Sequence, residues 1–83
     1  MQIELYTRIV LLRDVPEEGL KQGDTAMYIE HLPVSDGEDG AILEVFNALG
    51  ESIAVVTVPI SLIAPLRADY VPSVRLMTDA RAS

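Results

Sequence analysis

The single histidine of the chain is the residue best suited to acid–base or metal chemistry. His31 directly follows Glu30, and Asp36 lies nearby in the chain, so either carboxylate could orient the imidazole or share a metal with it. A catalytic zinc, however, uses three protein ligands and an open position. No such set accompanies His31, and we interpret it as a structural or surface histidine.

Three further carboxylates lie close together in the segment 33–40. Asp36, Glu38 and Asp39 could attract a hard cation such as Ca²⁺, but their spacing does not follow the ligand pattern of a calcium loop. Two of them directly precede a glycine, as turn residues commonly do. We therefore predict a solvated hairpin turn and no metal site.

The remaining groups with catalytic potential lack partners. Glu17 and Glu18 are adjacent in a predicted loop, where side chains usually diverge instead of facing each other across a cleft. The hydroxyl groups have only His31 as a base, and the scattered glycines form no phosphate-binding motif. We predict no enzymatic activity, no catalytic residue and no cofactor. The hydroxyl groups considered are those of Tyr28, Ser52, Thr57 and Ser61.

Charge and hydropathy limit the classes of partner. The 83 residues, enough for one domain, include 13 acidic and 6 basic side chains, a net charge of −7. Nucleic acids are disfavoured because phosphate binding depends on basic side chains, and a basic protein is an easier partner. The apolar runs are far shorter than the roughly 20 residues that span a bilayer, so no membrane helix is expected. With no cysteine and no secretory signal pattern at Met1, we expect a cytoplasmic protein.

Short β-branched segments separated by turn residues predict an all-β fold of five strands, arranged as a small barrel. The loop 14–23 follows the first strand, and Val15 and Leu20 are the apolar groups available to fix it. In the second strand, alternation places His31 on the face opposite Tyr28. The expected strands are 3–13, 24–32, 41–47, 51–58 and a last brief strand that follows a helical turn within 60–66 and closes the barrel.

Two segments, 6–24 and 46–59, carry a family pattern. With these residues the chain resembles the domain of unknown function 4926 family of small bacterial proteins. The resemblance covers residues 5–66 approximately, implies an SH3-like β-barrel and implies no established activity. Together with the five strands expected above, it leads us to predict a barrel over residues 1–66 and a C-terminal extension, 67–83. Ala26 stands where the pattern has glycine, which disfavours nucleic-acid binding of the KOW type. The matching residues are Asp14, Pro16, Glu17, Gly19, Leu20, Gly23, Asp24, Ala54, Val55, Val56, Thr57 and Pro59.

The fourth predicted strand is apolar on both faces, whereas a strand at a protein surface normally alternates apolar and polar residues. Ile53 and Val55 point to one side of the strand. Ala54, Val56 and Val58 point to the other side. We expect the second face to be covered by the chain's own loops, by the tail 67–83, by a second subunit or by another protein. The predicted interface residues are Ala54, Val56 and Val58 in the strand and Tyr70, Val71, Val74 and Leu76 in the tail.

These observations favour a small binding module that associates with itself as a homo-oligomer or with a basic partner protein. An antitoxin or immunity-type inhibitor of a neighbouring gene product is the alternative, because an acidic chain suits a basic active site. A KOW-like nucleic-acid-binding module is a third hypothesis, and salt-dependent binding would distinguish it.

Overall fold

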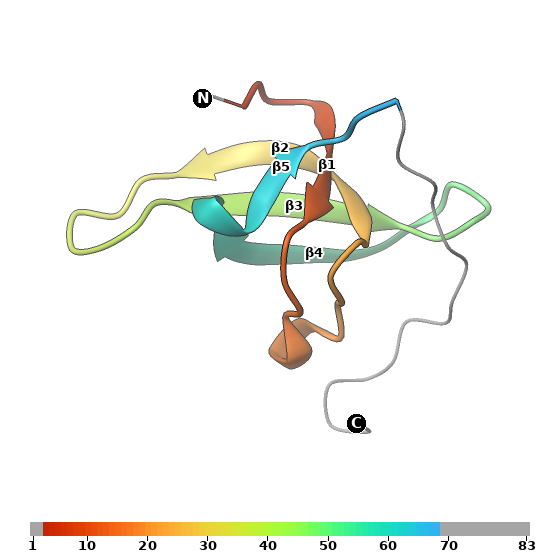
Figure 1. Cartoon of the computed structure of the whole chain (residues 1–83), viewed down its shortest axis with the longest axis horizontal. Helices are drawn as coiled ribbons and strands as arrows, with labels where there is room; N and C mark the ends of the chain where they lie inside the picture. Colours follow the sequence, from red (N-terminus) through yellow and green to blue (C-terminus); the bar gives the residue numbers. More distant parts are fainter. Residues whose placement is uncertain (1–2, 69–83) are drawn as a thin grey trace.

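The described part of the chain is one antiparallel β-sheet. In this computed structural model, which describes residues 3–68, the five strands lie in the order β4-β3-β2-β1-β5 (Figure 1). The elements are β1 (Thr7–Leu11), the 3₁₀ helix η1 (Pro16–Glu18), β2 (Thr25–Leu32), β3 (Gly40–Phe46), β4 (Ser52–Pro59), the 3₁₀ helix η2 (Ile60–Leu62) and β5 (Ile63–Pro65).

The predicted all-β fold with five strands is confirmed as a small barrel-like structure, and one detail differs. The short strand β5 follows the helical turn η2, as expected, but it pairs with β1 alone. No ladder among the described residues joins β5 to β4, so the sheet is not closed and β4 and β5 are its two edges. The same part of the chain contains no helix of the length and hydropathy that crossing a membrane requires. The expected tail, 67–83, lies almost entirely outside the described residues.

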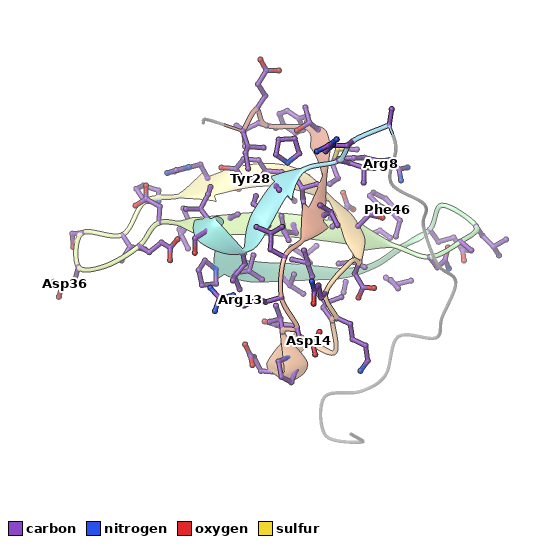
Figure 2. All side chains as sticks on the ribbon, viewed as in Figure 1. Arg8, Arg13, Asp14, Tyr28, Asp36 and Phe46 are labelled. Atoms are coloured by element: carbon purple, nitrogen blue, oxygen red, sulfur yellow. The ribbon has the colours of Figure 1, made fainter. Side chains whose placement is uncertain are left out.

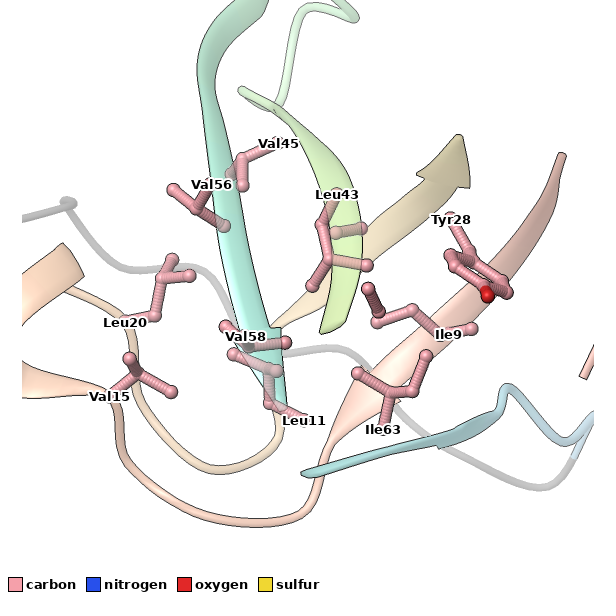
Figure 3. Close-up of a cluster of buried hydrophobic side chains, with 12 residues drawn as sticks. Ile9, Leu11, Val15, Leu20, Tyr28, Leu43, Val45, Val56, Val58 and Ile63 are labelled. Carbon is pink, nitrogen blue, oxygen red and sulfur yellow. The ribbon is translucent and has the colours of Figure 1, made fainter. Parts of the chain in front are cut away.

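Strand alternation places one apolar face of the sheet inside. Along β3, Ala41, Leu43 and Val45 are buried, while Ile42 and Glu44 between them are half-buried on the opposite face. The side chains of the core are apolar, and the hydroxyl of Tyr28 is the one polar group that they carry (Figure 3). The core cluster consists of Ile9, Leu11, Val15, Leu20, Ala26, Tyr28, Ala41, Leu43, Val45, Val56, Val58 and Ile63.

The loop between β1 and β2 folds back on the core. Val15 and Leu20 form an isolated bridge, and each is 3% exposed, which confirms that they fix the loop. Between them η1 begins at Pro16 and ends at Gly19, whose φ of 72° is accessible to glycine at little cost. Asp14 closes the loop because its Oδ1 accepts a hydrogen bond of 2.8 Å from the Gln22 N–H.

Two β-bulges interrupt the regular alternation. The β2–β3 register shifts between Tyr28 and Glu30, so Ile29 is an extra residue in β2. In the β3–β4 pair, Val45 lies opposite Ala54 while the next residue of β3 lies opposite Ser52, so Ile53 is an extra residue in β4. Each bulge exchanges the faces on which the following residues lie.

We predict that Leu43→Ala destabilises the protein by about 2–5 kcal/mol, because Leu43 is fully buried at the centre of the sheet and its truncation leaves a cavity. Leu49→Ala is the matched control, since Leu49 is 84% exposed, and it should change the free energy of unfolding by no more than about 0.5 kcal/mol. Denaturant unfolding measures both, and equal losses in the two variants would contradict this core.

Candidate interaction surface

His31 lies at the end of β2 in a hydrogen-bonded series with Tyr28 and Asp39. Its Nε2 is 2.8 Å from Asp39 Oδ2, and its Nδ1 is 3.1 Å from the Tyr28 hydroxyl oxygen. Neither Glu30 nor Asp36, the two carboxylates considered from the sequence, makes these contacts. The prediction that His31 and Tyr28 lie on opposite faces is wrong, because the bulge at Ile29 returns both to the core side of the sheet.

This series is saturated with internal hydrogen bonds. Burial, and secondarily the charge of Asp39, raise the pKa of Tyr28, so its hydroxyl stays protonated and can donate to His31 Nδ1. In the tautomer that accepts from Tyr28 at Nδ1, the ring hydrogen is on Nε2 and is donated to Asp39 Oδ2, while Asp39 Oδ1 accepts from the Val34 N–H at 3.1 Å. Both ring nitrogens are used, and the series acts as a clamp that joins β2 to the segment 33–40.

The acidic turn between β2 and β3 is likewise occupied by structural contacts. Glu38 Oε2 accepts a hydrogen bond of 2.7 Å from the Ser61 N–H in η2, and the Asp39 carbonyl accepts one of 2.9 Å from the Ile60 N–H. Asp36 lies at the exposed tip of this turn (Figure 2). Within residues 3–68 no group of three or more histidine, aspartate or glutamate side chains is placed to hold a metal ion.

The other candidate groups are separated from one another. Glu17 and Glu18 lie in η1, and the hydroxyl-bearing residues Ser52, Thr57 and Ser61 are exposed on β4 and η2. Among the four hydroxyl groups considered from the sequence, only that of Tyr28 lies within hydrogen-bonding distance of the histidine. Within the described residues, these side chains form structural hydrogen bonds, and none of the hydroxyl groups is assembled with a base as a nucleophile.

The two apolar faces of β4 are present, but their assignment from the sequence was reversed. Val56 and Val58 are 5% and 1% exposed and belong to the protein's own core, and Ala54 packs against that core. Their side chains cannot form an outer surface, because they pack within the protein's own core cluster. Ile53 and Val55, which are 46% and 61% exposed, are the residues that reach solvent. The predicted interface residues of the tail, Tyr70, Val71, Val74 and Leu76, lie outside the described residues.

An exposed apolar surface is centred on the β3–β4 hairpin, and we call it the hairpin surface. It consists of Phe46, Leu49, Ile53 and Val55, all exposed. The hairpin extends from the sheet at the end opposite to the acidic turn (Figure 1), and Phe46 lies near its base (Figure 2). Several large apolar side chains exposed on one hairpin are typical of a binding site.

The tip of the hairpin is held by one side chain. Asn47 Oδ1 accepts hydrogen bonds of 2.9 Å from the backbone N–H groups of Leu49 and Glu51, and Asn47 Nδ2 donates to Glu51 Oε1 at 2.8 Å. Gly50 adopts a φ of 82° to complete the turn. The turn therefore presents Leu49 to solvent in a fixed position. The sequence predicted this turn but did not indicate the exposure of Leu49, because turn propensity does not report which apolar side chain is left uncovered.

A charged residue lies beside the hairpin surface. The registers place Val55 opposite Glu44 and Glu44 opposite Met27, so these side chains form a row across the outer face of the sheet. Glu51 lies at the hairpin tip immediately before β4. The acidic side chains of Glu44 and Glu51 thus lie near the hairpin surface.

No family model, curated protein or solved structure matches the chain. The assignment of this surface therefore depends on its own geometry. Three residues of the motif in segment 6–24 have structural roles. Asp14 closes the first loop, Gly19 is the C-cap of η1, and Gly23 adopts a φ of 92°. Their pattern is accounted for by backbone conformation and by hydrogen bonding within the loop.

The clamp predicts a specific acid dependence of stability. The hydrogen bond from the Val34 N–H, followed by that from His31, lowers the pKa of Asp39 below its ordinary value near 3.8. Because the folded pKa is the lower one, the stabilisation is complete above the unfolded pKa and is lost as pH falls through the folded value. We expect Asp39→Asn to lower the unfolding midpoint at neutral pH, with a difference from wild type that shrinks below about pH 4.

Asp36→Asn is the control for this measurement, since Asp36 is exposed in the same turn and takes no part in the hydrogen bonds of the clamp. Thermal unfolding of the three proteins between neutral and acid pH tests the clamp. A pH-independent difference between Asp39→Asn and wild type would contradict it.

Proposed function

We propose that this chain is a non-enzymatic binding module that associates with another protein molecule through the hairpin surface. The observation that carries the proposal is the exposure of Phe46, Leu49, Ile53 and Val55 on one hairpin of a small domain. Burial of apolar area drives most protein association, and large apolar side chains on a rigid support act as its anchors.

The partner is a second copy of the chain or a protein with a basic surface. The net charge of −7 and the positions of Glu44 and Glu51 near the hairpin surface support a basic partner, because complementary charges increase the rate of encounter and its selectivity. The same charge balance does not suit phosphate-rich nucleic acids, so we do not propose a KOW-type function.

A non-catalytic role is supported by the internal use of the histidine. The chain has one histidine, and both of its ring nitrogens lie within hydrogen-bonding distance of neighbouring side chains. A general base must reach the proton that it removes from a substrate. We further propose a cytoplasmic location, in keeping with a chain without cysteine, and membership of the domain of unknown function 4926 family on the residues of its two motif segments.

Site-specific photo-crosslinking in the producing cells tests this proposal. A photoreactive amino acid in place of Val55 should give a discrete covalent adduct with a protein, because Val55 would lie within the interface. The same amino acid in place of Asp36, at the opposite end of the sheet, should give none. Adducts of equal yield from both positions, or no adduct from position 55, would contradict the proposed function.

A further inference from the structure

The two edges of the sheet differ in their capacity to accept another strand. On β5, the Ile63 N–H donates to the Ile60 carbonyl, and Pro65 has no N–H. The Leu12 N–H donates to the Leu62 carbonyl, and the Leu66 N–H donates to the Arg8 carbonyl. Residues 62, 64 and 66 therefore form the hydrogen bonds to β1, and the backbone groups of residues 63 and 65 point away from the sheet. The β5 edge therefore offers no free backbone donor along its short length.

The β4 edge offers donors over a short stretch. The Ile60 N–H donates to the Asp39 carbonyl. Because hydrogen-bonded pairs recur at every second residue of an antiparallel ladder, residues 54, 56 and 58 form the backbone hydrogen bonds to β3. Val55 and Thr57 consequently direct their N–H and C=O groups away from the sheet. The bulge at Ile53 limits this stretch at one end, and Pro59, which has no N–H, limits it at the other.

This stretch is complementary to itself. If two β4 strands meet antiparallel about a two-fold axis at Val56, Val55 of each copy lies opposite Thr57 of the other. Each such pair can exchange both of its backbone hydrogen bonds. On the outer face, the exposed Val55 side chain then packs against the Thr57 side chain of the second copy.

Charge does not oppose a second copy along the β4 edge itself. Every position from 52 to 66 is uncharged, so the molecule meets its copy along a segment without acidic residues although its net charge is −7. Glu51 directly precedes β4, five residues from Val56, and the two Glu44 residues lie one strand inward on each side. Strand spacing puts them about 14 Å apart, beyond the roughly 8 Å over which charges act at physiological ionic strength. Natural edge strands usually carry a charge to prevent such pairing, and β4 carries none.

From these observations we infer that two copies of the chain pair through the free edges of their β4 strands, antiparallel about Val56, so that one sheet continues from copy to copy. This inference rests on the proposed function and names the partner as a second copy. Within residues 3–68 the pairing uses the one edge with outward donors in each copy, so the assembly closes as a two-fold dimer and does not extend into a fibre.

Sedimentation equilibrium of the full chain tests the dimer. Wild type should be dimeric at high micromolar concentration, and Val55→Lys should raise the dissociation constant about tenfold or more, because the change enters the interface twice. Val34→Lys is the matched control, since Val34 is also an exposed valine but lies in the turn after β2, and its dissociation constant should equal that of wild type.

Thr57→Pro provides a second, charge-neutral variant. It removes an outward N–H without taking a bond from the β3 ladder, and it should also favour the monomer by about tenfold or more. Circular dichroism establishes that each variant is folded before its mass is measured. Equal weakening by Val34→Lys and Val55→Lys would overturn the β4 dimer, as would a folded Thr57→Pro that dimerises like wild type.

The result for wild type also separates this inference from the proposed function. A monomer up to about 1 mM overturns the dimer, and the proposed function then survives only if position 55 still crosslinks to a different protein. A monomer whose Val55 and Thr57 amides exchange slowly at every concentration would assign the edge to residues 69–83 of the same chain. That outcome too would overturn the inference.

Discussion

Strand β4 must satisfy two requirements that conflict at the surface of a small protein. It supplies Val56 and Val58 to the core, and it is also the last strand of the sheet on its side. Because successive side chains in a strand alternate between faces, burying these two residues forces Val55 outward. The edge position leaves the backbone groups of the outward residues without a neighbouring strand. The exposed apolar side chains and the open edge thus have one origin in the position of β4.

Several of the acidic side chains fix the connections between strands. Asp14 closes the first loop, Glu38 bonds to the backbone of η2, and Asp39 joins β2 to its turn through His31. Carboxylates are effective acceptors for backbone N–H groups that have no partner within a ladder. This use explains how a chain with 13 acidic residues and one histidine can lack an assembled catalytic site in its described part.

Regular features of the fold could be predicted from the sequence. Apolar alternation located the strands, and the isolated positions of Val15 and Leu20 in a polar loop indicated that they enter the core. The bulges could not be predicted, because inserting one residue into a ladder depends on pairing between strands and leaves no local pattern. The bulge at Ile29 gave His31 an unexpected partner. On β4, the sequence showed two apolar faces but could not show which one the sheet would bury.

The most direct test of the account is an isotope-filtered NMR measurement on a mixture of ¹³C-labelled and unlabelled full-length chains. Val56 residues related by the proposed two-fold axis form a pair in which the α-carbons approach to about 4.5 Å. The account predicts intermolecular cross-peaks between the α-protons of Val56 in labelled and unlabelled chains, accompanied by contacts from Val55 to Thr57. Cross-peaks that arise only elsewhere on the surface, or none between chains at millimolar concentration, would contradict association through β4.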